Sequence, residues 1–350
     1  MSKLLLDDFK PWLQKAISES GGVSACAIPL DHPDFRQAVT DNAIEYQQWL
    51  NQGFAGDMHY LERFADKKAT PWDLFPEMKS IITFTFSNDW GSPEAQHPFP
   101  TPRPDKLVGY ISAYAKEQDY HRTGHQIMLK LQEKLNVLLG RELNVEYAVD
   151  TKPIFERLFA SFGGLGIKAP NDLIRTPERD VRVFIGTLFI DDELPLVQHQ
   201  AKMRFPCEFC RNCEEKCPTG AITPGQPFNS LKCSSYLSIE KKGPLNKQQR
   251  IDLEDWLFGC DWCTVVCPPK DKIDTRIPIE LDWLLKSSGG EVKRLLKGTS
   301  IEYAGVPQLR RNAIAILQEK YPDHPEAKEL IEWTAENSKA KVIQDQINNL

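Results

Sequence analysis

Four cysteines stand within a stretch of twelve residues, at positions 207, 210, 213 and 217, and a proline follows at position 218. The 350-residue chain has only nine cysteines, so this run constrains the fold of its region more than any other feature. Closely spaced cysteines suit a zinc site, a disulfide framework or an iron–sulfur cluster. The exact spacing of the run, together with the cysteines elsewhere, separates these three possibilities.

The spacing C-x2-C-x2-C-x3-C-P is typical of proteins with two [4Fe–4S] clusters, in which the fourth cysteine binds the other cluster. The chain supplies a second run, C-x2-C-x3-C-P, at residues 260–268, and a further cysteine at position 233. The exchange rule predicts a first cysteine set and a second cysteine set: Cys207, Cys210, Cys213 and Cys267 for one cluster, and Cys217, Cys233, Cys260 and Cys263 for the other. Zinc also binds paired C-x2-C units, but zinc sites seldom carry this ending twice. The module is therefore predicted to conduct electrons.

Composition narrows the class of protein. Cys26 lies alone in an apolar run and is interpreted as a buried strand residue. Crowding of the other cysteines into one module argues against a secreted disulfide scaffold. A net charge of -6 excludes a general attraction to nucleic acid or to an anionic membrane. The first twenty residues are interpreted as a surface helix rather than a signal peptide. No run of about 18 apolar residues, as a membrane-spanning helix needs, occurs in the sequence. We expect a cytoplasmic protein that spans no membrane.

The first 200 residues alternate between strand-like and helical patterns. Runs rich in Val, Ile, Phe and Tyr predict strands at residues 23–30, 80–87, 107–116, 144–150 and 181–191. Helical periodicity marks residues 127–139 and 154–162, and the second of these ends at Gly163 and Gly164. The GGLG motif at 163–166 follows a helix, which is the wrong side for a dinucleotide-binding loop. A largely antiparallel sheet is predicted.

These patterns predict an α+β fold in three domains. Residues 1–199 form an N-terminal α/β sandwich, residues 200–275 form a bacterial ferredoxin-like module with two clusters, and residues 276–350 form a helical, HEAT-like region. A ferredoxin alone would be much shorter than this chain. The N-terminal domain is therefore expected to hold the acceptor of the electrons.

Two further segments carry a more selective signal than the cysteines. KCSSYLSIEKKGPL at 232–245 and WLFGCDWCTVVCP at 256–268 resemble stretches of the epoxyqueuosine reductase family. GDMHYLER at 56–63, YAKEQDYH at 114–121 and VDTKPIFERLFASFGGLG at 149–166 are similar to the family in order and approximate spacing. The resemblance extends from about residue 50 to 315.

The resemblance implies a cytoplasmic enzyme that uses cobalamin and two [4Fe–4S] clusters. It implies reduction of the epoxide of epoxyqueuosine, at the wobble position of tRNA, to the alkene of queuosine, which is the last step of queuosine synthesis. The tRNA anticodon loop and an electron donor such as a flavodoxin or ferredoxin are the partners expected, and the enzyme is expected to be a monomer.

By position in VDTKP-x-x-ER, the resemblance makes Asp150 the proton donor to the departing oxygen and a cofactor contact. The residues themselves agree with this role. Asp150 ends an apolar strand, where a ligand cleft can lie, and partial desolvation there would help the carboxyl to keep its proton. The alternative is an aspartate that caps a helix or a turn before Thr151.

Other candidate residues lie in the matching segments. Ser235 and Asp261 lie beside cysteines of the second cysteine set, and Tyr236 follows Ser235. Tyr114 and His121 lie in the segment that matches the cofactor side of the family, and Arg63 ends another matching segment. We predict cofactor contacts at Arg63, Tyr114, Ser235 and Asp261. The alternative for Arg63 is the charged face of an exposed helix, and for His121 a structural histidine.

A tRNA ligand requires a local positive surface. Residues 286–320 contain seven Lys or Arg against three Glu, and Lys241 and Lys242 follow the SYLSIE segment. We predict phosphate contacts from Lys241, Lys242, Arg310 and Arg311. The alternative is an ordinary solvated helix face.

One segment departs from the family. Its members usually read close to GLGWIGKN after the catalytic segment, whereas this chain reads GGLGIKAPNDLI. Such a loop is expected next to the cofactor or the substrate. Two other functions therefore remain open: a corrinoid reductase of another substrate, such as an organohalide, and a two-cluster electron carrier without catalytic activity.

Overall fold

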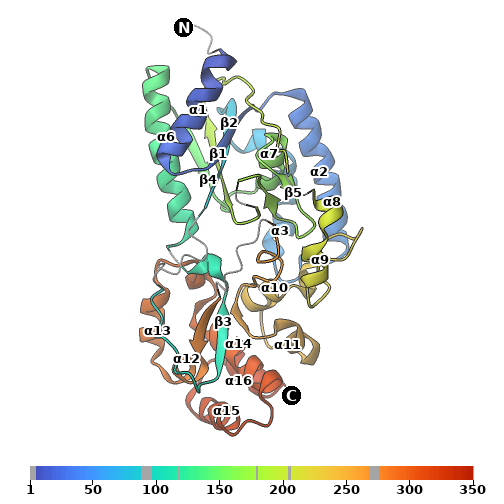
Figure 1. Cartoon of the computed structure of the whole chain (residues 1–350), viewed down its shortest axis with the longest axis vertical. Helices are drawn as coiled ribbons and strands as arrows, with labels where there is room; N and C mark the ends of the chain where they lie inside the picture. Colours follow the sequence, from blue (N-terminus) through green and yellow to red (C-terminus); the bar gives the residue numbers. More distant parts are fainter. Residues whose placement is uncertain are drawn as a thin grey trace.

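The fold is described from a computed structural model (Figure 1) over residues 5–87, 97–116, 118–178, 180–203, 206–268 and 276–349. The N-terminal part is built on a four-stranded antiparallel sheet with the order β1-β2-β7-β4. Its strands are β1 (Ser24–Pro29), β2 (Ser80–Phe86), β4 (Val145–Ala148) and β7 (Phe184–Ile190). Ser24 is paired with Thr85 across β1 and β2, and Ser80 with Ile190 across β2 and β7. The expected largely antiparallel sheet is confirmed.

Helices cover both faces of this sheet (Figure 1). One face packs against α1 (Leu6–Ser20) and α6 (Tyr120–Leu139), and the other against α2 (Pro33–Asn51) and α7 (Glu156–Phe162). Phe84 belongs to the core on the α1 and α6 side, and its neighbour Ile81 to the core on the opposite side. Every residue of β2 is buried, because a strand covered on both faces turns all its side chains into a core. This is the predicted α/β sandwich, and Cys26 is buried in β1 as expected.

Three short helices follow α2 and lead into β2. They are α3 (His59–Arg63), α4 (Ala65–Ala69) and α5 (Pro71–Leu74). A small hairpin of β5 (Ile167–Lys168) and β6 (Ile174–Arg175) lies between α7 and β7.

The end of α7 explains the paired glycines. A Cβ on Gly163 would overlap the sulfur of Cys26, and Gly164 adopts a φ of +70° with its backbone against the carbonyl of His199. A left-handed residue after a helix favours glycine. The helix therefore ends where the sequence predicted, and both glycines are needed for different reasons.

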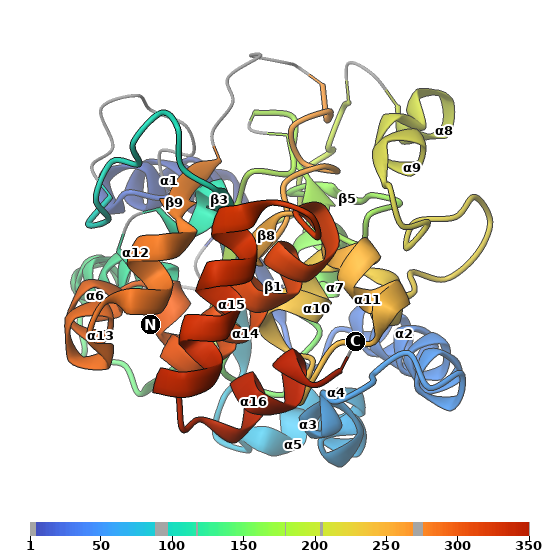
Figure 2. The same ribbon diagram turned by 90° about the horizontal axis from the view of Figure 1, so that it is seen from below.

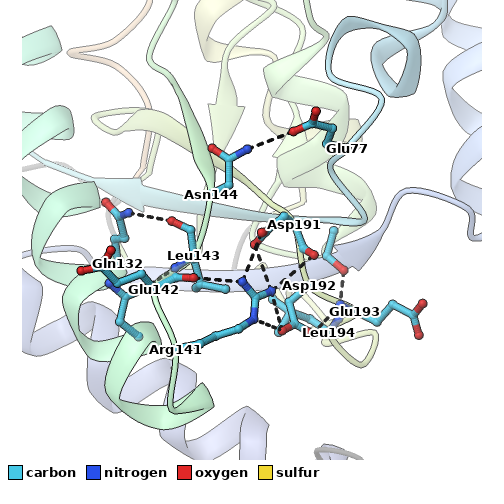
Figure 3. Close-up of polar contacts among 12 residues, drawn as sticks. Glu77, Gln132, Arg141, Glu142, Leu143, Asn144, Asp191, Asp192, Glu193 and Leu194 are labelled. Atoms are coloured by element: carbon cyan, nitrogen blue, oxygen red, sulfur yellow. Dashed lines mark hydrogen bonds and ion pairs between the residues drawn. The ribbon is translucent and has the colours of Figure 1, made fainter.

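One ion-pair cluster joins the C-terminal end of α6 to the end of β7 (Figure 3). Arg141 lies 3.1 Å from Asp191 and 2.8 Å from Asp192. Gln132 of α6 donates a hydrogen bond to the carbonyl of Leu143, just before β4. The edge strand β4, which ends two residues before Asp150, is thereby held to α6 at its start.

The predicted strand at 107–116 does not join the first sheet. Its ordered part, β3 (Val108–Ile111), is the central strand of a second sheet, β8-β3-β9. It is parallel to β8 (Trp256–Phe258) and antiparallel to β9 (Ile277–Glu280). Ile111 is buried among residues of the C-terminal core, which is the reason for this pairing. The sequence prediction of a strand was right, but its assignment to the first sheet was wrong.

The cysteine module is mostly loops and single turns. Its elements are α8 (Cys207–Cys210), α9 (Asn212–Lys216), η2 (Ser230–Lys232), α10 (Ser234–Ile239) and α11 (Lys247–Leu253). Strand β8 follows α11 and leads directly to Cys260. The module thus shares the second sheet with β3, and a 3-10 turn, η1 (Ala113–Ala115), connects β3 toward α6.

The C-terminal region is helical, as expected (Figure 2). Its helices are α12 (Leu281–Lys286), α13 (Gly289–Leu296), η3 (Ser300–Tyr303), α14 (Gly305–Lys320), α15 (Pro325–Asn337) and α16 (Lys341–Ile347). Helix α14 is central, since it packs against α12, α13, α15 and α16 and buries Leu309 and Ala313. Within the ranges described, no helix is long and apolar enough to cross a membrane. The domain boundaries at 199 and 275 stay predictions.

Candidate active site and cluster-binding cysteines

The first cysteine set converges on one pocket. Cys207, Cys210, Cys213 and Cys267 all line it, together with residues of the β5–β6 hairpin such as Asn171 and Arg175. Three of these cysteines come from α8 and α9, and the fourth lies more than fifty residues later in the chain. The fold therefore brings together the four thiols that the exchange rule groups into one ligand set. Their role as ligands stays a prediction.

The second cysteine set also comes together. Burial raises the pKa of the Cys263 thiol, and Cys233 and Cys217, together with Cys213 of the first set, raise it further. The Cys260 thiol is likewise raised in pKa by burial, then by Cys263 and Cys233. Mutual electrostatic influence of this kind requires that the thiols lie close to one another. Four thiols are what one [4Fe–4S] cluster needs, so both sets fit the group that they are expected to hold.

Asp150 follows β4 by two residues and has an unusual backbone. Its φ is +53°, in the left-handed region, and its side chain is exposed. The Tyr120 hydroxyl donates a hydrogen bond to its Oδ2 at 3.1 Å, and its own N–H donates to Oε1 of Glu156 at 2.8 Å. We expected partial desolvation of this carboxyl, and that expectation was wrong, because the loop turns the side chain outward. Two neighbours nevertheless hold it in a strained conformation, which often marks a functional residue.

Tyr120 begins α6 and is itself tightly packed. Its ring is stacked on Phe184 at 4.4 Å between centroids and on His121 at 4.2 Å. Asp119 caps the helix by accepting a hydrogen bond from the N–H of His121. Burial, followed by the charge of Asp150, raises the pKa of Tyr120, so its hydroxyl stays protonated and remains a donor to Asp150.

Glu156, in the first turn of α7, is a functional candidate that the sequence analysis missed. Burial and then the charge of Asp150 raise its pKa to about 8, against the opposing effects of the hydrogen bond from the Asp150 N–H and of Lys68 and Arg157. Near neutral pH this carboxyl therefore keeps its proton. An acid that retains its proton beside an exposed carboxylate is a typical pair for proton transfer. The only sequence signal was its place in VDTKPIFER.

Two tyrosines from distant segments lie near enough to Asp150 for its charge to contribute to their raised pKa values. Tyr60 of α3 is 46% exposed and Tyr303 of η3 is 63% exposed, which is unusual for large side chains. The Tyr303 hydroxyl donates to Glu240 at 3.1 Å. Burial raises the pKa of Tyr303 to about 12, and the charges of Glu240 and Asp150 contribute to this shift. Asp150 therefore lies near exposed tyrosines from both halves of the chain.

Comparison with known proteins identifies the family. A model described as "4Fe-4S double cluster binding domain" matches residues 206–270, and one described as "Epoxyqueuosine reductase QueG, DUF1730" matches residues 68–151. An epoxyqueuosine reductase of Cyclobacterium marinum is 32% identical over 66% of this chain and 71% of its own length. The chain belongs to the epoxyqueuosine reductase family. One from Francisella cf. novicida is 30% identical over 64% of this chain, and the alignment spans 61% of that relative's length.

The fold agrees with this family. A solved structure described as epoxyqueuosine reductase with a tRNA-Tyr epoxyqueuosine-modified tRNA stem loop superimposes with a TM-score of 0.75. The superposition covers 99% of this chain and 98% of the solved one at 22% identity. This similarity shows that the two chains share a fold. The cysteine module is a 4Fe–4S double cluster domain, which removes zinc as the alternative.

Tyr114 lies between two parts of the candidate site. Its ring lies 6.5 Å from that of Tyr120 and 6.0 Å from that of Phe258. A Cβ on Gly259, which precedes Cys260, would lie 3.2 Å from Cε1 of Tyr114. The ring therefore lies between Tyr120, which contacts Asp150, and the segment that carries Cys260. Its role as a cofactor contact stays a prediction.

The other predicted cofactor contacts, Ser235, Arg63 and Asp261, differ in their burial and in their partners. Ser235 lies in the first turn of α10, and its backbone N–H is hydrogen bonded to Cys233. Arg63 is exposed at the end of α3, with its guanidinium 5.2 Å above the ring of Phe64. Asp261 corrects our expectation, because it is only 2% exposed and accepts hydrogen bonds from Ser112 and Ala113. Its carboxylate holds η1, and with it Tyr114, against the cysteine module.

The four residues predicted to contact phosphates differ in how far their side chains are buried. Lys242 is exposed, and Lys241 forms an ion pair with Asp57 at 3.0 Å. Arg310 is half-buried and donates to the carbonyls of Leu284 and Ser287. Arg311 is fully buried in α14 and donates to the carbonyls of Leu237 and Lys241. The prediction for Arg311 was wrong, because no part of its side chain reaches the surface.

The loop that departs from the family lies against the first cysteine set. Residues 169–171 line the same pocket as Cys207 and Cys267. We expected this loop beside the cofactor or the substrate. The β5–β6 hairpin carries these residues to the cluster side of the molecule, and their position relative to cobalamin or the substrate stays a prediction.

Proposed function

We propose that this chain reduces epoxyqueuosine to queuosine at the wobble position of tRNA, the last step of queuosine synthesis. Membership of the epoxyqueuosine reductase family supports the reaction. The observation that carries the proposal is the position of Tyr114, with Asp150 on one side and the second cysteine set on the other. An acid and an electron source beside one site are what the reduction of an epoxide requires.

Conversion of an epoxide to an alkene consumes two electrons and two protons and releases the oxygen as water. Cobalamin, when bound, would receive electrons from the two clusters and would supply the reducing chemistry at the substrate carbon. The residues exposed around Asp150 suit such a flat, amphiphilic cofactor, since Tyr60 and Tyr303 offer both aromatic faces and hydroxyl groups. Tyr114, Ser235 and Arg63 are the further candidates for holding it.

The protons come from this chain's own residues. In its protonated form Asp150 donates one proton to the oxygen that leaves the carbon, and the second proton of the water comes from solvent at this exposed site; the same exposure lets Asp150 reach a nucleobase that is presented from outside. Glu156 holds a proton beside it at neutral pH, because burial and the charge of Asp150 raise its pKa to about 8. The Tyr120 hydroxyl orients the Asp150 carboxylate. This arrangement matches the acid and proton reservoir of general acid catalysis.

The partners follow from the substrate. Lys241, Lys242 and Arg310 are proposed to contact the tRNA backbone, and a flavodoxin or ferredoxin is proposed as electron donor. A cytoplasmic location and a monomeric state are part of the same proposal. Residues 1–199 are proposed to bind cobalamin, residues 200–275 the clusters, and residues 276–350 to form the helical support.

The test is a turnover assay on anaerobically purified protein with cobalamin, a strong reductant and tRNA that carries epoxyqueuosine. Digestion and mass measurement of the nucleosides should reveal queuosine, in amounts that scale with enzyme. Absence of product from protein that holds both clusters and cobalamin would contradict the substrate. Dehalogenation of an organohalide by the same preparation would then favour the corrinoid reductase alternative.

A further inference from the structure

Arg175 is a buried cation at the first cysteine set. It ends β6 of the hairpin, is only 3% exposed, and lines the pocket formed by Cys207, Cys210, Cys213 and Cys267. Its Nη1 donates a hydrogen bond to Sγ of Cys207 at 3.5 Å, and its Nη2 donates to the carbonyl of Pro268, next to Cys267, at 3.2 Å. One guanidinium therefore contacts both of the segments that supply this set.

The Arg175 guanidinium is a permanent cation, because an arginine side chain is not deprotonated in proteins. Arg211 also lines the pocket, where its Nε lies 2.7 Å from Oε2 of Glu214.

The second cysteine set receives donors of a different kind. Cys217 lies 3.5 Å from the Thr219 hydroxyl, and the groups beside Cys263 and Cys233 are the neutral side-chain amide of Asn171 and the backbone N–H groups of Tyr236 and Ser235. Net charge and hydrogen bonds to the sulfurs are main determinants of the reduction potential of an iron–sulfur cluster. A cationic donor stabilises the reduced cluster more than a neutral donor, because reduction adds one negative charge.

We propose that Arg175 raises the reduction potential of the cluster held by the first cysteine set above that of the second cluster. The proposal rests on the two clusters of the proposed function. Each cluster takes up one electron at a time, and the donor's first electron then resides at the first cluster. Arg175 is a positioning and tuning residue here, since it touches a ligand and not the substrate. It lies just beyond the loop that departs from the family, which gives that departure a consequence for electron transfer.

The test is an anaerobic redox titration of the holoprotein with dithionite and mediators, followed by electron paramagnetic resonance. The wild-type protein should give two cluster signals at separate potentials. Arg175→Gln should make the higher-potential cluster about tenfold harder to reduce, a downward shift of about 59 mV for a one-electron couple. Arg175→Lys keeps the positive charge and should therefore retain a potential close to that of the wild-type protein. Arg211→Gln is the matched control, because it removes an exposed, paired charge from the same pocket.

An unchanged potential in Arg175→Gln with full iron and sulfide content would overturn the proposal. So would an equal shift in Arg211→Gln, because the effect would then not depend on the buried hydrogen bond. Loss of the first cluster from both the Gln and the Lys variants would assign Arg175 a purely structural role. The readout involves no tRNA, so failure of the proposed substrate leaves it intact, whereas a wild-type protein without clusters would remove both ideas.

Discussion

The hydroxyl of Tyr120 donates a hydrogen bond to Oδ2 of Asp150 at 3.1 Å, across the gap between the start of α6 and the end of β4. The donor ring is fixed by its stack on Phe184, so the acceptor is held as well. An exposed carboxylate is normally free to adopt several rotamers. Here the fold restricts it, and a proton donor benefits from such restriction.

Asp150→Asn should abolish most turnover, by about 10²–10⁴-fold, because an amide cannot donate a proton to the departing oxygen. Both clusters and tRNA binding should persist, since the side chain is exposed and buries no core surface. Single-turnover formation of queuosine, with iron content measured on the same sample, checks this. Glu146→Gln is the control, because it neutralises a carboxylate on the same loop-bearing strand and should retain activity. Full activity of Asp150→Asn would refute the role.

Glu156→Gln should change how stability depends on pH. The folded pKa of Glu156, about 8, lies above its ordinary value of 4.5, so the folded state keeps a proton that the unfolded state releases. The stability from this group is complete below about pH 4.5 and is lost as the pH rises toward 8. Relative to wild type, the variant should therefore gain stability between pH 6 and 8.5.

Urea denaturation midpoints of the anaerobic holoprotein, measured over that pH range, provide the comparison for Glu156→Gln. The difference between variant and wild type should grow steadily with pH and level off above pH 8. A difference that is constant with pH would mean that Glu156 ionises in the folded protein as it does in the unfolded chain.

Arg311→Met should cost about 1.5–3 kcal/mol of stability, because the carbonyls of Leu237 and Lys241 lose a charged donor. The affinity of the folded variant for tRNA should be unchanged, since Arg311 is fully buried. Denaturation and filter binding measure the two quantities separately. Lys320→Met, at the exposed end of the same helix, is the control and should leave stability nearly unaltered. Weaker tRNA binding without lost stability would restore the original prediction.

Lys242→Ala should weaken tRNA binding and leave stability nearly unchanged, which is the opposite of the result expected for Arg311→Met. Lys242 is exposed, and its ammonium lies 5.8 Å from the ring centroid of Tyr303, one of the aromatic residues near Asp150. Loss of one phosphate contact should weaken tRNA binding and reduce the slope of log K against log salt by about 1. Stability should stay within about 0.5 kcal/mol of wild type. An unchanged salt slope would exclude Lys242 from the interface.

The elements that sequence predicted well are those whose signal is local. β2 and β7 are runs rich in β-branched and aromatic residues, and β1 is a short, mostly apolar run. All of β1, β2, β4 and β7 lie within their predicted ranges. The sheet to which β3 belongs was not predictable in this way. Tyr110 is paired with Trp256 and with Pro278, and nothing in the local pattern of residues 107–116 specifies partners so far along the chain.

The candidate site shows the same division. The grouping of cysteines followed from a spacing rule, and the pocket contains the four predicted thiols of the first set. Glu156 was missed because its raised pKa depends on burial and on Asp150, which only the folded chain brings together. Arg311 was misjudged because a count of basic residues along a segment does not distinguish the buried face of α14 from the exposed one.

The pairing of β3 has a consequence for synthesis on the ribosome. β3 is translated long before β8 and β9, and it needs both of them to satisfy its backbone hydrogen bonds. While residues 112–255 are being made, the sandwich strands can find their partners, but residues 108–111 remain an unpaired strand joined to it. Such a strand is prone to aggregation until the chain is nearly complete. Nascent chains arrested before residue 256 should therefore need a chaperone that chains arrested after residue 280 do not.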